Sequence, residues 1–184
     1  MAYEGSDPLS DTKWNQTLND LEELSQRVGQ SLAIRQFFLA TAESCTGGGV
    51  GQAITAIPGS STWYERGFIT YSNLAKEELL GVLPTTLATF GAVSETTALE
   101  MAKGALIRSH AHIALAVTGI AGPGGATPGK PVGTVCFAWV RHDGLMQAVT
   151  HYLSGDRTAV RYQSVVVALE GILEILQKSL ASNE

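Results

Sequence analysis

The sequence predicts an α/β protein, a three-layer α/β/α sandwich with a mixed sheet, built as a single domain at 16–182 after an N-terminal extension at 1–15. Short apolar runs typical of buried strands alternate with segments of helical periodicity, and this alternation favours parallel strands joined by helices. Near the C-terminus two β-rich segments flank "RHDG", whose Asp143-Gly144 pair favours a hairpin with antiparallel strands. A chain of 184 residues is long enough to bury such a core.

The first half of the chain supplies a helix, two strands and a second helix. Residues 1–15 are expected to be a flexible tail, and leucine and valine then recur at steps of three and four from Thr17 to Leu32, which predicts an amphipathic helix. "FFLATA" is a short apolar run expected of a buried strand, and a glycine-rich loop follows it. "RGFITYS" predicts a second strand, and residues 74–82 a helix.

The second half completes the sheet and its cover. Ser94 is a good N-cap for a helix that reaches about Ser109. "HIALAVTG" predicts another buried strand, and "PVGTVCFAWV" and "MQAVTHYL" predict the two strands of the hairpin. A long helix is expected from about Asp156 to Leu180, and loops at the strand ends are where such folds place their chemistry.

Composition and charge exclude several classes of protein. A net charge of -5 and a pI near 5.3 argue against binding nucleic acid or an anionic membrane, because such binding needs clustered Lys and Arg. The N-terminal residues do not resemble a signal peptide, and no apolar run is long enough to span a membrane, so a cytoplasmic location is expected. Cys45 and Cys136 are predicted to be free thiols.

The glycine-rich loop "AESCTGGG" leaves three interpretations open. Its amides could bind a phosphate at a helix N-terminus, or Ser44 could be a nucleophile at a strand-to-helix turn, although the GxSxG pattern is absent. The loop could equally be a simple bend. Glu43 could orient a partner or cap a helix, and Cys45 could be a nucleophile, although buried inert cysteines are commoner.

A second glycine-rich segment, "GGATPGKP", satisfies the first part of a P-loop pattern but then fails. Pro131 occupies the position of the Ser or Thr that would hold Mg²⁺, and the segment precedes a strand instead of a helix. ATP hydrolysis is therefore excluded. The turn "TGIAGPGG" remains as a candidate, where Thr118 could offer its hydroxyl to a ligand or stabilise the turn.

The segment "PGSSTWYERGFITYSNLAK" concentrates candidate nucleophiles and bases. A serine such as Ser61 can be activated by Lys76 if that lysine is neutral, which requires burial or a neighbouring cation, and Arg66 is a candidate for the cation. The alternative is a capping serine and a solvated lysine, with Tyr71 in the core of a strand.

Histidines and arginines elsewhere give weaker signals. The pair His110 and His112 lacks a third ligand at suitable spacing, so no metal is assigned. Arg157 and Arg161 are four residues apart at the start of the last helix, where a positive charge is disfavoured, which indicates an acidic or phosphate partner or else a salt bridge to Asp156 or Glu65.

Taken together, these stretches resemble one family. In order and spacing, the chain from about Leu18 to Leu180 is similar to the CinA C-terminal domain family through "TAESCTGGGVGQAI", "GSSTWYERGFITYSNLAK", "GAVSE", "AVTGIAGPGG", "KPVGTV" and "SGDR". The chain looks like a standalone member, without the molybdopterin-binding-like domain of full-length CinA proteins. The resemblance implies an α/β/α fold, hydrolysis of the carboxamide of nicotinamide mononucleotide to nicotinate mononucleotide and ammonia, no cofactor or metal, and a homodimer.

The resemblance also implies a set of site residues. The catalytic positions correspond to Ser61, Lys76, Tyr71 and Ser44, and the substrate-binding positions to Thr118, Arg157, Gly47, Gly48 and Gly119. In this hypothesis a serine attacks the amide, Lys76 is the general base, Tyr71 tunes Lys76 or relays the proton, and glycine-loop amides hold the oxyanion. Ser61 is the preferred nucleophile because it shares a segment with Tyr71 and Lys76. The competing hypothesis is a nucleotide- or partner-binding module without turnover.

Overall fold

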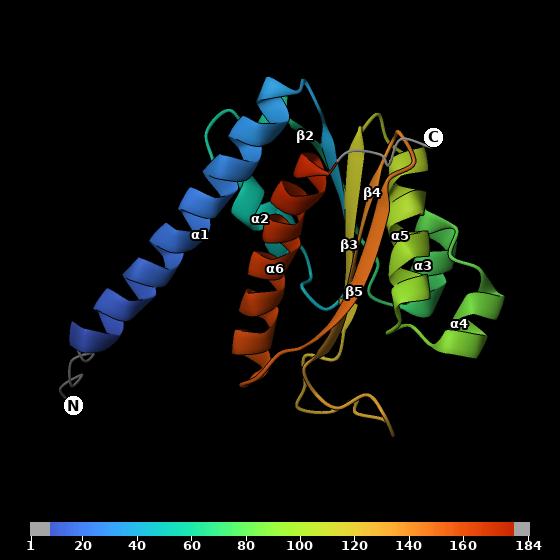
Figure 1. The fold of residues 1–184 in the computed structure, drawn as a ribbon. Coiled ribbons are helices and arrows are strands. Elements are labelled where there is room, and N and C mark those ends of the chain that lie inside the picture. The colour runs from blue at the N-terminus through green and yellow to red at the C-terminus, as the bar shows by residue number, and fades with distance from the viewer. Residues whose placement is uncertain (1–7, 179–184) are drawn as a thin grey trace.

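The computed structural model describes residues 8–178, which form a five-stranded mixed sheet covered by helices on both faces (Figure 1). The strand order is β2-β1-β3-β4-β5, in which β1 is parallel to β2 and β3, while β3, β4 and β5 are antiparallel neighbours. The strands are β1 (Leu39–Glu43), β2 (Tyr64–Ile69), β3 (Ile113–Gly119), β4 (Thr134–Arg141) and β5 (Met146–Tyr152).

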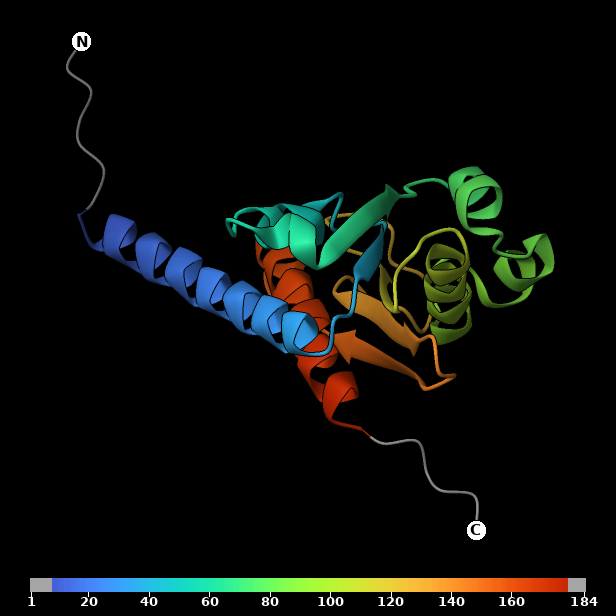
Figure 2. The same cartoon turned by 90° about the horizontal axis from the view of Figure 1, so that it is seen from above.

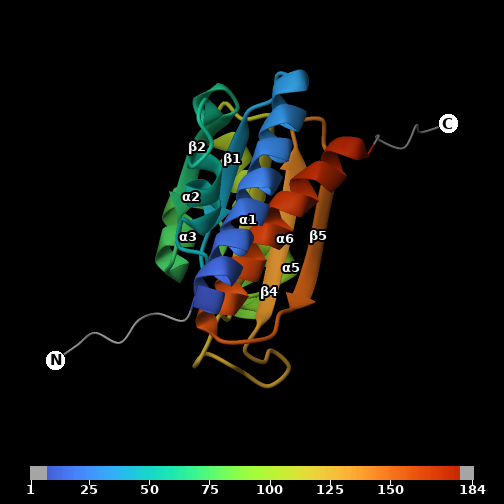
Figure 3. The same cartoon turned by 90° about the vertical axis from the view of Figure 1, so that its left-hand side faces the viewer.

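The helices form the two outer layers. Helices α1, α2 and α6 cover one face of the sheet, and α3, α4 and α5 lie on the other (Figures 1 and 3). Their bounds are α1 (Pro8–Ile34), α2 (Gly49–Thr55), α3 (Asn73–Leu80), α4 (Pro84–Phe90), α5 (Glu95–Ile107) and α6 (Arg157–Gln177), with a 3-10 turn, η1 (Ser60–Thr62). The predicted three-layer fold with a mixed sheet is confirmed.

The alternation of side chains along β3 explains why the two layers differ. Large residues (Ile113, Leu115 and Val117) point toward α1 and α6, whereas Ala114 and Ala116 point toward α5. The facing surface of α5 is also made of small residues, including Ala98, Ala102 and Ala105. Small side chains on both surfaces let the backbones of helix and sheet approach closely.

Two helix ends differ from the prediction, and one helix was not predicted. Helix α1 begins at Pro8 rather than Thr17, and its first half projects beyond the rest of the domain (Figure 2). Proline is tolerated in a first helical turn because its missing N–H would have no intrahelical partner there. Helix α6 ends at Gln177, before the predicted end near Leu180, and the part of the predicted tail at 1–7 lies outside the described residues. Helix α4 was not predicted from the sequence.

The site is positioned by the parallel part of the sheet. Strands β2, β1 and β3 are adjacent and parallel, so their carboxyl ends meet at one edge. Each of these ends is followed by a segment singled out in the sequence: Ser44 after β1, Tyr71 after β2, and Thr118 at the end of β3. Ligand sites of open α/β sheets form at such an edge.

A close helix contact gives a test of the packing. A Cβ on Gly104 of α5 would lie 1.9 Å from the carbonyl oxygen of Leu80 at the end of α3, so the backbone itself would have to move. Gly104→Ala is expected to lower the free energy of unfolding by about 2 kcal/mol, measured by urea denaturation. Gly124→Ala is the control, because nothing lies within 4 Å of its Cβ position. Equal stability of the two variants would contradict this packing.

Candidate active site

The centre of the site is a buried pair formed by Ser44 and Lys76. Ser72 caps α3 by accepting a hydrogen bond from the amide of Ala75, and Lys76 therefore lies one turn into the helix, where its side chain is only 1% exposed. Its Nζ lies 3.0 Å from Ser44 Oγ and donates to the carbonyl of Thr70 at 2.8 Å. Ser44 is itself 8% exposed, so both side chains are largely shielded from water.

Burial changes the protonation of Lys76. Desolvation lowers the pKa of its amine from the ordinary value of 10.5, because the charged form loses its hydration. Neither of the two ion pairs in the described part of the chain, Arg66–Glu65 and Arg141–Asp143, involves this amine. Arg66, the cation considered from the sequence, is exposed and donates to Glu65 and to the carbonyl of Arg108. Burial, and not Arg66, therefore favours a neutral lysine.

The glycine loop is organised differently from a phosphate cradle. The carboxylate of Glu43, 1% exposed, accepts hydrogen bonds from the amides of Gly48, Val50 and Gly51 at 2.9–3.0 Å. The amide of Gly47 donates to the carbonyl of Ser44. The prediction that amides of Gly47 and Gly48 bind substrate is therefore not supported, because an internal carboxylate and a turn already occupy them. Both glycines have positive φ (62° and 96°), which glycine adopts without strain.

A pocket of about 200 Å³ opens beside Ser44 and Lys76. Seven of its lining residues are Ser44, Cys45, Tyr71, Lys76, Thr118, Gly119 and Arg157, which the sequence had singled out, and the other four are Asn73, Ala92, Val93 and Ala121. Asn73 was missed although it stands in the same "TYSNLAK" stretch as Lys76. No sequence pattern marks Asn73 as a site residue, and only the folded structure places its exposed side chain in the same pocket lining as Tyr71.

Arg157 connects three segments around the pocket. Its Nη2 donates to the hydroxyl of Tyr71 at 3.0 Å, and its Nη1 donates to the carbonyl of Gly122 at 2.8 Å. The hydroxyl of Thr118 donates to the carbonyl of Ala92 at 2.7 Å. Tyr71 thus contacts the guanidinium of Arg157, whereas the predicted contact with Lys76 is not among the hydrogen bonds of the described residues.

The structure separates Ser61 from the other predicted catalytic residues. Ser61 is exposed on η1, just before the amino end of β2, whereas Tyr71 and Lys76 follow the carboxyl end of that strand. It is absent from the lining of the pocket. The preference for Ser61 over Ser44 is therefore not supported. Although Ser61 and Lys76 are close in the sequence, the whole length of β2 separates them in space.

Cys45 is chemically unsuited to act as a nucleophile. Burial raises the pKa of its thiol to about 11, so the thiolate is scarce near neutral pH. Cys136 is also a buried free thiol, and desolvation raises its pKa as well. Both cysteines are unpaired, as the sequence predicts.

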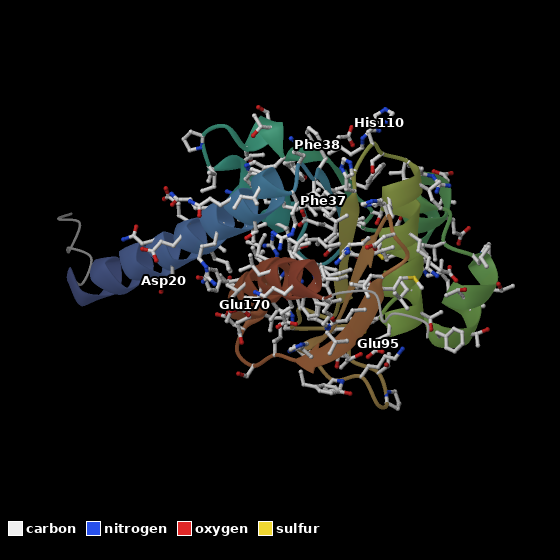
Figure 4. The ribbon with its side chains drawn as sticks, turned by 45° about the horizontal axis from the view of Figure 1, so that its top comes forward. Asp20, Phe37, Phe38, Glu95, His110 and Glu170 are labelled. Atoms are coloured by element: carbon white, nitrogen blue, oxygen red, sulfur yellow. The ribbon has the colours of Figure 1, made fainter. Side chains whose placement is uncertain are left out.

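The histidine pair lies away from this pocket. His112 precedes β3 and accepts a hydrogen bond at Nδ1 from the amide of Phe38, and its ring stacks on Phe37 at 5.1 Å. Figure 4 shows Phe37, Phe38 and His110 near one another at this end of the sheet. Within residues 8–178, no cluster of three or more His, Cys, Asp or Glu side chains is arranged to hold a metal ion.

The fold and the pocket together define a class of protein. A buried serine lies beside a buried lysine whose pKa is lowered, at the strand ends of an α/β sandwich, and this arrangement is compatible with a hydrolase. The chain belongs to the CinA C-terminal domain family, which residues 21–176 match. None of the helices between residues 8 and 178 has the length and apolar character needed to cross a bilayer.

Relatives and solved structures agree with this assignment. The chain is 50% identical over 153 residues to a nicotinamide-nucleotide amidohydrolase PncC from Enterobacter agglomerans, covering 83% of this chain and 93% of that protein. It is 51% identical over 154 residues to the PncC of Escherichia coli K12, with 84% and 93% covered. The crystal structure of the competence/damage inducible protein CihA from Agrobacterium tumefaciens is similar, with a TM-score of 0.84, 48% identity, and 86% and 96% covered.

Proposed function

We propose that this protein is a nicotinamide-nucleotide amidase, which hydrolyses the carboxamide of nicotinamide mononucleotide to nicotinate mononucleotide and ammonia. The observation that carries the proposal is the 3.0 Å approach of Lys76 Nζ to Ser44 Oγ in a buried site that favours the neutral amine. The relatives named PncC are nicotinamide-nucleotide amidohydrolases by their names, and the chain covers nearly their whole length.

The chemistry uses Ser44 as nucleophile and Lys76 as base. In its neutral form Lys76 donates one N–H to the carbonyl of Thr70, and its lone pair can take the proton of Ser44. Ser44 Oγ then bonds to the amide carbon, and the resulting ammonium of Lys76 gives its proton to the departing ammonia. Water attacks the acyl-serine, Lys76 accepts a proton from that water, and Ser44 regains its hydroxyl as nicotinate mononucleotide leaves.

The oxyanion donors in this proposal are the amides that follow Ser44. Within the described residues the amides of Cys45 and Thr46 donate to no other residue, whereas those of Gly47 and Gly48 are occupied. The residue after a nucleophile is the usual source of such an amide in α/β hydrolases. Cys45 lines the pocket, so its amide is the first candidate.

The phosphate of the substrate is assigned to the part of the pocket that Arg157 lines. Arg157 offers a permanent positive charge there, and Tyr71 and Asn73 offer polar groups beside it. Thr118 and Gly119 line the pocket at the end of β3 and are proposed to contact the nucleoside portion. A negatively charged protein must capture a phosphate through such local charge.

Release of ammonia from nicotinamide mononucleotide by the purified protein tests the function. Wild type is expected to turn over, and Arg157→Gln is expected to raise KM for the mononucleotide about tenfold or more while changing KM for nicotinamide riboside little, because the riboside lacks the phosphate. Binding of the mononucleotide without ammonia release would contradict an amidase and identify a binding module.

The activity is expected to rise with pH as Lys76 loses its proton. The protonated amine cannot accept the proton of Ser44, so kcat/KM should increase through the lowered pKa of Lys76 and level off below its ordinary value of 10.5. Stability should rise in the same window, since the unfolded chain then binds a proton that the folded chain does not. A pH profile that falls across this range, measured with buffers of constant ionic strength, would contradict a neutral lysine base.

We propose further that the protein acts in the cytoplasm as a homodimer. Two buried, unpaired cysteines fit a reducing compartment. Several large apolar side chains on and around α3 and α4 are exposed, among them Leu74, Leu79, Leu83 and Phe90, and a partner surface would shield them. Light scattering that gives the mass of one chain at micromolar concentration would exclude the dimer.

A further inference from the structure

Arg161 contacts the loop that carries Ser44 but not the pocket. It lies one turn after Arg157 on α6, yet its Nε donates to the carbonyl of Cys45 at 3.2 Å and its Nη2 to the carbonyl of Thr46 at 2.9 Å. The guanidinium also lies against Gly47, whose Cβ position would be 3.6 Å from Nη2. Arg161 is not among the residues that line the pocket.

These two bonds fix the direction of the loop's peptide groups. In a trans peptide the carbonyl and the following N–H point in opposite directions. Because the carbonyls of Cys45 and Thr46 point toward Arg161, the amides of Thr46 and Gly47 must point away from it. The amide of Gly47 accordingly donates to the carbonyl of Ser44 at 3.0 Å, which fixes the peptide that bears the amide of Cys45.

Two side chains of opposite charge thus hold the loop, one through its backbone amides and the other through its backbone carbonyls. Glu43 accepts from the amides that begin α2, and Arg161 donates to the carbonyls that precede them. Hydrogen bonds to charged groups are roughly twice as strong as neutral ones. A neutral side chain at position 161 would therefore hold the two carbonyls less firmly.

We propose that Arg161 is a positioning residue, which holds Ser44 Oγ against Lys76 and aims the amides of Cys45 and Thr46 at the reacting carbonyl. This role rests on the proposed function of Ser44 and Lys76. It differs from the role of phosphate ligand suggested by the spacing of Arg157 and Arg161. The Nε and Nη2 groups of Arg161 already donate to backbone carbonyls of the loop. Loss of the two hydrogen bonds from Arg161 would misplace Ser44 and the loop amides, so it should lower kcat more than it raises KM.

The test compares Arg161→Gln with a matched control at the other end of the fold. Arg141 also donates from its guanidinium to two backbone carbonyls, those of Ile175 and Lys178, and is 13% exposed. Arg161→Gln is expected to lower kcat about 10- to 100-fold with KM within about threefold of wild type. Arg141→Gln is expected to lose thermal stability but to keep kcat and KM. A larger change in KM than in kcat for Arg161→Gln would overturn the proposal and make Arg161 a substrate ligand.

A second readout separates this proposal from the proposed function. A neutral fluorophosphonate labels an activated serine as Oγ bonds to phosphorus, fluoride leaves and the base takes the serine proton, and the reagent needs no phosphate site. The labelling rate of Ser44, followed by mass spectrometry, should fall about 10- to 100-fold in Arg161→Gln and be unchanged in Arg141→Gln. Absence of labelling in wild type would contradict the proposed function; equal labelling of wild type and Arg161→Gln would overturn only the role of Arg161.

Arg161→Lys keeps the test decisive if Arg161→Gln does not fold. A lysine retains the charge but lacks the planar fork that reaches two carbonyls together. Its labelling rate and kcat are expected to lie between those of wild type and Arg161→Gln, about tenfold below wild type. A rate equal to wild type would overturn the proposal, because a point charge would then suffice.

Discussion

Replacing Lys76 with methionine is expected to abolish ammonia release while leaving the protein folded. Methionine fills a similar volume but provides no base, so kcat/KM should fall at least about 10³-fold. The free energy of unfolding should stay the same or rise, because the buried amine no longer has to be desolvated. Urea denaturation and an ammonia assay measure the two effects on the same sample.

Lys130→Met is the matched control for this substitution. Lys130 also donates from its amine to a backbone carbonyl, that of Phe90, but it does so on the exposed loop before β4. The Lys130→Met variant is expected to keep the activity of wild type. A Lys76→Met protein that retains turnover, or one that is unfolded while the control is folded, would contradict the assignment of Lys76 as a buried neutral base.

Ser44→Ala is expected to lose activity and Ser61→Ala to keep it. Removal of the nucleophile should lower kcat about 10⁴-fold or more, whereas Ser61 is exposed at the far end of β2. Both substitutions remove one hydroxyl, so each serves as the control for the other. Binding of nicotinamide mononucleotide, measured by calorimetry, should persist in Ser44→Ala within about tenfold, since the contacts assigned to its phosphate are intact.

The reverse result would restore the interpretation favoured by the sequence. Inactive Ser61→Ala with active Ser44→Ala would mean that η1 moves to the pocket during the reaction. Loss of activity in both variants, with normal unfolding curves, would indicate that Ser61 acts on a different step. Activity in both would exclude Ser44 and Ser61 as the nucleophile.

Much of the fold was predictable because its signals are local. The apolar run of β3 and the Asp143-Gly144 turn identify their elements without reference to the rest of the chain. The caps Ser94 and Asp156 are also local, since each accepts a hydrogen bond from an amide three residues further on. Helix α4 was missed because seven residues with three threonines and one proline give no clear periodicity.

The site was less predictable because it depends on contacts between distant residues. Lys76 and Ser44 are 32 positions apart, and only the parallel pairing of β1 with β2 brings their segments to one edge. Ser61 shares a segment with Lys76 but lies on the other side of a full strand. The sequence shows the glycines of the loop, but not that the side chain of Glu43 occupies their amides.

The carboxylate of Glu43 also bears on the orientation of the substrate in the proposed function. Glu43 neutralises the N-terminus of α2, and Arg161 beside it is bonded to backbone carbonyls, so Arg157 is the arginine on the pocket lining that can attract a phosphate. In the proposed function, a ligand with one anionic and one uncharged end is expected to bind with its amide toward Ser44 and its phosphate toward Arg157.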